Sequence, residues 1–104
     1  RSKRTELKGD VTVHVFVSGK VQGVFFRKYT HAEAVKLHLK GWVRNLEDGR
    51  VEVLAQGPDA PIQRLLTWLS KGSPKSHVTS VEIADRWGDA LTEHGTLGPF
   101  TILR

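Results

Sequence analysis

Alternation between valine and other residues over positions 11–17 is the feature that most restricts how this chain can fold. Every second residue of the stretch VTVHVFV is valine, and a period of two places successive side chains on opposite faces of an extended strand. The pattern predicts a β-strand with one strongly aliphatic face. Gly19 and Gly23 then interrupt it and predict a loop over residues 18–23.

A helix is expected next, because residues 25–39 contain no glycine or proline and their apolar positions recur at steps of four, four and three. The residues that define this spacing are Phe26, Thr30, Ala34 and Leu37. We expect Gly41 to close the helix. His31 and His38 both fall within the expected helix, seven residues apart.

A hairpin and a second helix follow. Residues 42–46 and 51–55 are apolar runs that flank an Asp48-Gly49 pair, which is a strong hairpin signal. The second helix has the cleanest amphipathic spacing in the chain, at Ile62, Leu65, Leu66 and Leu69. Asp59 can cap this helix, and Pro61 is tolerated in its first turn.

Two further strands are expected near the carboxyl end, around Val81 and Ile83 and over residues 100–103. The element order is therefore βαββαβ with a terminal strand added. This order predicts an α+β ferredoxin-like sandwich, in which a mostly antiparallel sheet has both helices on one face. Residues 11–104 form the expected domain and residues 1–10 a flexible basic lead-in. Fold alone does not decide function, because this architecture serves binding proteins and enzymes alike.

Charge and composition exclude several classes of function. The chain carries +5 with histidine neutral, of which the first ten residues contribute +2. It contains no cysteine, so disulfides and thiolate chemistry are excluded. No run approaches the about 18 apolar residues that cross a bilayer. We expect a cytoplasmic monomer with no membrane partner, whose modest excess charge attracts small anions.

The loop over residues 19–24 connects a strand to a helix start, and Arg27 lies in the first turn of that helix. Unpaired amides at a helix start, the helix dipole and a guanidinium together suit a phosphate group. The Gly-Lys-Ser/Thr ending of a P-loop is absent, so spacing alone leaves a plain strand-to-helix connection open as well.

Two longer motifs resemble the acylphosphatases. Residues 17–27, VSGKVQGVFFR, resemble the first signature of that family. Residues 41–45, GWVRN, followed by Asp48-Gly49 and Val51, resemble the second. The resemblance covers about residues 11–81, whereas residues 86–98 have no counterpart. It implies hydrolysis of small acyl phosphates to a carboxylate and inorganic phosphate, on a ferredoxin-like fold and without a metal or other cofactor.

The resemblance also implies roles for particular residues. The phosphate-binding arginine corresponds to Arg27 and the water-orienting asparagine to Asn45. The backbone amides that hold the phosphate correspond to Gly19, Lys20, Val21, Gln22, Gly23 and Val24. Leu46 departs from the family, because vertebrate members often have a threonine there, which leaves a hydroxyl contact at that position in doubt.

A metal site, an RNA-binding module and a phosphate sensor are alternatives on this fold. The five histidines show no metal-ligand spacing, so we expect no metal site. An RNA-binding module shares the element order, but it would carry aromatic residues on its central strands, and residues 51–55 have none. A catalytically idle phosphate sensor would use the same loop, and the presence of Arg27 and Asn45 argues against it. We therefore expect no nucleic acid partner. Trp42 and Trp68 are expected to pack rather than to stack on a ligand.

Overall fold

The computed structural model describes residues 10–23, 25–88 and 97–103. Of the expected lead-in, Asp10 alone lies within the described residues, and it begins the first strand. The elements, in chain order, are β1 (Asp10–Lys20), α1 (Phe26–Lys36), β2 (Lys40–Asn45), β3 (Val51–Pro58), α2 (Asp59–Lys71), β4 (His77–Trp87) and β5 (Thr101–Ile102). None of the helices in this described part of the chain is long and apolar enough to cross a membrane.

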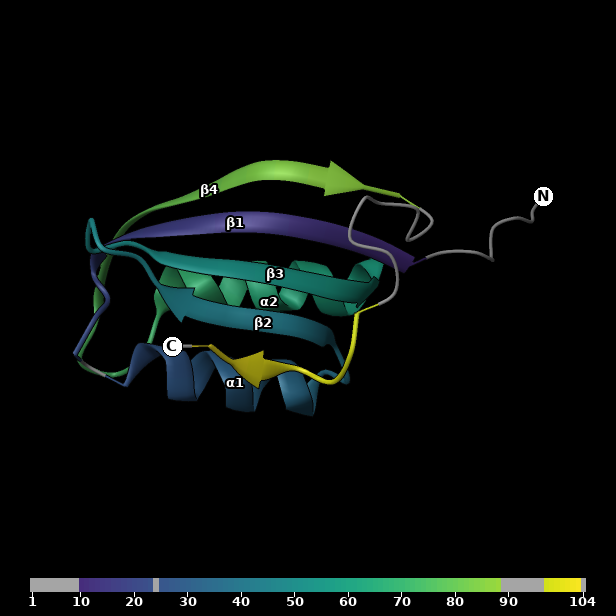
Figure 1. Cartoon of the computed structure of the whole chain (residues 1–104), viewed down its shortest axis with the longest axis horizontal. Coiled ribbons are helices and arrows are strands. Elements are labelled where there is room, and N and C mark those ends of the chain that lie inside the picture. The colour runs from purple at the N-terminus through teal and green to yellow at the C-terminus, as the bar shows by residue number, and fades with distance from the viewer. Residues whose placement is uncertain (1–9, 24, 89–96, 104) are drawn as a thin grey trace.

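The five strands form one mixed sheet in the order β4-β1-β3-β2-β5. The first four pair antiparallel, and β5 pairs parallel with β2 at the edge of the sheet. Figure 1 shows both helices packed along this sheet, with α1 next to β2 and β5. The expected ferredoxin-like α+β fold with an added terminal strand is confirmed.

The hydrophobic core lies between the valine face of β1 and the two helices. Val13, Val15 and Val17 are fully buried, in register with three buried residues of β3. α2 contributes Ile62, Leu65 and Leu69 to the same core, and α1 contributes Phe26 and Ala34. Trp68 packs against this core, with its ring centroid 5.6 Å from that of Phe26, as expected of a packing residue.

Several predicted boundaries were wrong. β1 continues through Lys20, so Ser18 and Gly19 belong to the strand rather than to the loop. The helix ends at Lys36, and His38 follows it with a left-handed φ of 60° instead of lying within it. The His38 and Leu39 amides donate to the Val35 and Ala34 carbonyls, which is the Schellman pattern of a helix end. Gly41 lies inside β2 and does not close the helix.

The start of α2 also differs from the expectation. Pro58 is the capping residue, and Asp59 is the first residue of the helix with no side-chain capping bond. Its carboxylate instead pairs with the guanidinium of Arg86 on β4. The hydrogen bond from Arg86 is the main reason that the pKa of Asp59 lies below its usual value. Asp59 therefore links α2 to β4.

Candidate active site

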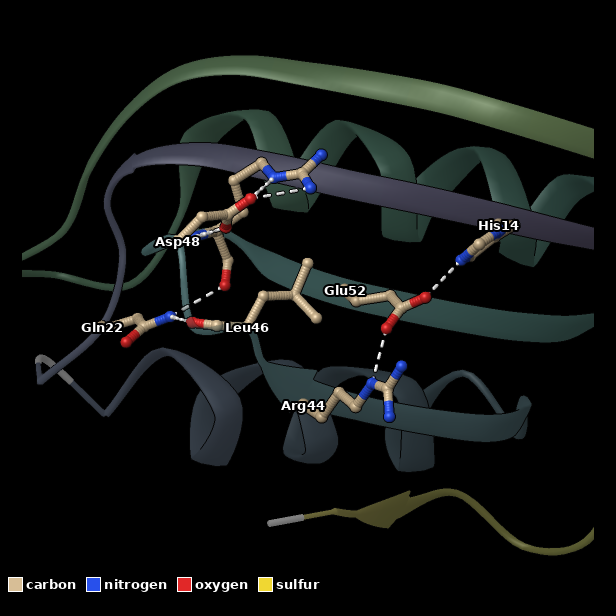
Figure 2. Close-up of polar contacts among 7 residues, drawn as sticks. His14, Gln22, Arg44, Leu46, Asp48 and Glu52 are labelled. Atoms are coloured by element: carbon tan, nitrogen blue, oxygen red, sulfur yellow. Dashed lines mark hydrogen bonds and ion pairs between the residues drawn. The ribbon is translucent and has the colours of Figure 1, made fainter.

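The loop between β1 and α1 is anchored by two adjacent residues directly after β1. Val21 is fully buried in the core. The side-chain amide of Gln22 donates to the carbonyl oxygens of Leu46 (2.7 Å) and Arg50 (2.8 Å), in the turn that joins β2 to β3 (Figure 2). The side chain of Gln22 thus braces the loop. The loop is held against the β2–β3 turn by side-chain bonds as well as by the chain itself.

Gly19 sets the direction in which the chain enters this loop. It lies at an irregularity in the β1–β4 register and has a φ of +124°, a region that only glycine adopts readily. A Cβ at this position would overlap the backbone of His77 and Thr79 on β4. The close approach of β4 therefore requires glycine here.

The amino end of α1 is open to a ligand. Phe25 occupies the capping position with a left-handed φ of 59°, and its side chain makes no capping bond. The first turn of α1 contains no acidic residue. Tyr29 is the first residue whose amide bonds back, to the carbonyl oxygen of Phe25, so the three preceding amides have no partner within the helix. The helix dipole adds partial positive charge at the same end.

A pocket of about 300 Å³ opens between this helix start, the loop and the edge of the sheet. Its walls are formed by Val21, Gly23, Phe25, Phe26, Arg27, Lys28, Asn45 and Ile102. Arg27 and Asn45, which are eighteen residues apart in sequence, thus line one pocket. Arg27 and Lys28 make this pocket cationic, which suits an anionic ligand.

The guanidinium of Arg27 is held at the edge of the sheet. Its Nη1 donates to the carbonyl oxygen of Leu103 at 3.0 Å, directly after β5. A guanidinium carries five N–H donors, so this one bond fixes the group and leaves donors for an anion. The end of β5 and the residue after it therefore both contribute to the pocket: Ile102 forms part of the wall, and Leu103 positions the arginine.

Asn45 ends β2 and presents an acceptor. Among the described residues, its Oδ1 is buried and makes no hydrogen bond to protein. A buried polar atom without a partner costs free energy, of the order of 1–3 kcal/mol. An amide oxygen in this position can accept a hydrogen bond from a water or a ligand in the pocket.

The turn beside the loop carries a carboxylate. The Asp48 carboxylate accepts bonds from the backbone amide of Arg50 (3.1 Å) and from its Nε (2.8 Å). The backbone bond is the main cause, and the guanidinium an additional one, of a pKa for Asp48 below its usual value. Asp48 is therefore ionised at neutral pH, and Arg50 neutralises it next to the loop.

The structure brings some of the expected site residues together and separates others. Arg27, Asn45, Val21 and Gly23 line the pocket. Gly19 and Lys20 belong to β1, and Gln22 points to the neighbouring turn. Val24 lies outside the described residues. Four wall residues were not expected, namely Phe25, Phe26, Lys28 and Ile102. Lys28 could have been expected in the pocket because it follows Arg27 directly in the sequence. Ile102 could not, because its place in the pocket depends on which strand β5 pairs with.

Fold and site together define a class: an α+β sandwich with an anion pocket at a helix start. The acylphosphatase family model matches residues 13–95. Acylphosphatase-1 of Gallus gallus is 49% identical over 84% of this chain and 89% of its own. The acylphosphatase of Pseudomonas paraeruginosa is 49% identical over 85% and 91%. The crystal structure of acylphosphatase from Bacillus subtilis superposes with a TM-score of 0.82 at 37% identity, covering 90% of this chain and 99% of its own.

The chain belongs to the acylphosphatase family of hydrolases, and it is therefore an enzyme. The resemblance that the two motifs indicated is confirmed over most of the chain. The family match extends to residue 95, so the expectation that residues 86–98 have no counterpart was wrong for most of that segment. The RNA-binding module and the idle phosphate sensor are not favoured by this membership.

Proposed function

We propose that the chain hydrolyses the carboxyl–phosphate bond of small acyl phosphates without a metal ion, by in-line attack of water. The bond from phosphorus to the acyl oxygen breaks, and a bond from phosphorus to the water oxygen forms. The products are a carboxylate and inorganic phosphate. The observation that carries this proposal is the meeting of Arg27 and the free acceptor of Asn45 in one pocket.

The leaving group explains why no acidic side chain is required. A carboxylate leaving group has a pKa of about 4 to 5, by analogy with acidic side chains, so it departs without being protonated. Phosphoryl transfer is largely dissociative, and charge gathers on the equatorial oxygens of the phosphoryl group. Positioning and electrostatic stabilisation therefore supply most of the rate enhancement.

Arg27 and the free amides at the start of α1 would hold the phosphoryl oxygens. A guanidinium offers parallel donors that match two oxygens of one phosphate. Its attachment to Leu103 supports a fixed orientation, which removes the cost of ordering a long side chain when the substrate binds. Lys28 would add charge at the rim of the pocket.

Asn45 would aim the attacking water. Its Oδ1 can accept a hydrogen bond from that water, which directs the oxygen lone pair of the water toward phosphorus. An amide is not a strong base, so the proton of the water passes to a phosphoryl oxygen of the substrate. The role of Asn45 is therefore orientation rather than proton removal.

Hydrolysis of benzoyl phosphate in excess EDTA tests the proposal, with inorganic phosphate as a competitive inhibitor. Arg27→Gln should lower kcat/KM by more than about 10³-fold, because one lost donor costs about 10² to 10³ and a charge is lost as well. Arg64→Gln, at an exposed position of α2, is the matched control and should leave the rate unchanged. A metal-dependent rate, or an Arg27→Gln enzyme as active as wild type, would refute the mechanism.

Asn45 has its own signature in the same assay. Asn45→Ala should lower kcat far more than it raises KM, since a positioned water contributes mainly in the transition state. Asn45→Asp retains an acceptor but adds negative charge beside the phosphate, so it should weaken substrate binding. If Asn45→Ala raised KM alone, Asn45 would bind substrate instead of orienting water.

A further inference from the structure

Two aromatic side chains are exposed directly beside the pocket, one at the cap of α1 and one on the helix itself. Phe25 is 71% exposed and Tyr29 is 45% exposed, although both are large apolar groups. With Lys28 and Ala32 they line a second hollow, of about 290 Å³. Phe25 and Lys28 also belong to the wall of the first pocket, so the two hollows are neighbours.

The fold gives no reason for a phenylalanine at position 25. Its left-handed backbone is unfavourable for a bulky side chain, and glycine or asparagine would adopt it more easily. At 71% exposure the ring gains little from burial in return. Strained residues of this kind are concentrated at binding sites, where a ligand supplies the missing contact.

The spacing of these residues forms an apolar track. Tyr29 and Ala32 lie on the same face of α1, since positions three apart are neighbours on a helix, and Phe25 at the cap of the helix lines the same hollow. Ala32 is small, and it leaves room at the far end of the hollow. The track starts at the anion pocket and leads away from it along the helix.

We propose that Phe25, Tyr29 and Ala32 form the binding subsite for the acyl half of the substrate, and that they favour aromatic or extended apolar acyl groups over acetyl. This inference rests on the function proposed above, which places the phosphoryl group in the first pocket. The acyl group is joined to that phosphoryl group by one oxygen, so it must lie at the pocket mouth, where the apolar track begins. The subsite thus determines which acyl phosphates are hydrolysed fastest.

The test compares kcat/KM for benzoyl phosphate and acetyl phosphate. Tyr29→Ala and Phe25→Asn should each lower the benzoyl-to-acetyl ratio by about tenfold, a usual scale for lost apolar contact in a specificity pocket. Asparagine tolerates the left-handed backbone at position 25, so that variant keeps the loop. For Tyr29→Ala, whose residue lies outside the first pocket, activity on acetyl phosphate and inhibition by inorganic phosphate should change less than about twofold, because neither ligand reaches Tyr29.

Val35→Ala is the matched control, because Val35 is also an exposed apolar residue of α1, at 50% exposure, but lines a different hollow. It should leave the ratio at the wild-type value. Sedimentation of wild type and of Tyr29→Ala at rising concentration tests whether the track instead joins two copies of the chain.

The outcomes separate the two proposals. A wild type that hydrolyses neither compound refutes the proposed function, and the subsite with it. If the wild type hydrolyses both compounds and neither substitution changes the benzoyl-to-acetyl ratio, the subsite alone is refuted and the proposed function stands. A dimer that Tyr29→Ala dissociates while the ratio stays fixed also overturns it, since the track would then be a contact between copies.

Discussion

At the scale of single residues, Gln22 has the clearest indirect effect on the pocket. Its amide joins the loop to the β2–β3 turn through two carbonyl oxygens. Those carbonyls also accept backbone bonds, from Gly49 to Leu46 and from Leu46 to Arg50. Loss of the Gln22 amide therefore leaves neither carbonyl unpaired, and its cost should appear in the position of the loop more than in the stability of the fold.

We predict that Gln22→Leu lowers kcat/KM about tenfold and raises the inhibition constant of inorganic phosphate, while unfolding free energy falls by only about 1 kcal/mol. Gln22→Glu should be worse, because a carboxylate would face two carbonyl oxygens. Glu47→Ala, at an exposed position of the same turn, should leave phosphate inhibition unchanged. Steady-state kinetics and urea unfolding measure both effects; a stable Gln22→Leu enzyme with full activity would contradict the bracing role.

At the scale of elements, the contact between β1 and β4 depends on Gly19. We predict that Gly19→Ala lowers the unfolding free energy by roughly 3 kcal/mol, because the new Cβ meets rigid backbone of β4 at a φ that alanine rarely adopts. Gly88→Ala is the control: its Cβ would enter open space, and the change should stay within about 0.5 kcal/mol. If urea unfolding gave equal losses of unfolding free energy for the two substitutions, β4 would move aside to admit the new Cβ, and the prediction would be wrong.

Elements whose signals are local were predictable from the sequence, and those that depend on distant contacts were not. The spacing of Ile62, Leu65 and Leu69 predicted α2, and all three are buried. The end of α1 was missed because His38 adopts a left-handed φ that tertiary packing and the Schellman bonds impose, and histidine carries no signal for it. The extension of β1 through Lys20 was missed because its pairing with His77 lies far away in sequence.

The residues of the candidate site also fall into those that the sequence indicated and those that depend on distant contacts. Arg27 and Asn45 were nominated by resemblance to a family, and the structure supplied their meeting in one pocket. A strand over residues 100–103 was expected, but Ile102 and Leu103 could not be nominated, because the sequence does not show that this strand pairs with β2 beside the pocket. The apolar track of Phe25 and Tyr29 was missed, because an exposed aromatic residue indicates a binding surface only once its neighbours in the structure are known.

At the scale of the whole molecule, Glu52 connects three strands on the sheet face opposite the helices. It is only 6% exposed. Its carboxylate accepts from Arg44 Nε on β2 (2.5 Å) and pairs with His14 Nε2 on β1 (2.6 Å), as Figure 2 shows. Arg44 in turn lies over the ring of Trp42, 5.3 Å from its centroid. Burial raises the pKa of Glu52, but the bonds and charges of His14 and Arg44 together hold it below the usual value.

A pKa lowered by folding stabilises the folded state at a pH above the unfolded value and loses that contribution as the pH falls through the folded value. We predict that unfolding free energy falls as the pH drops through about 4.3, the usual pKa of glutamate, and continues to fall below it. Glu52→Gln should cost about 2 kcal/mol at pH 7, the scale of a charged hydrogen bond, and progressively less below pH 4. Glu82→Gln, at an exposed position of β4, is the control. Urea unfolding from pH 3 to pH 7 measures the difference between these variants; a cost for Glu52→Gln that stayed constant over this range would exclude Glu52 as a source of the acid sensitivity.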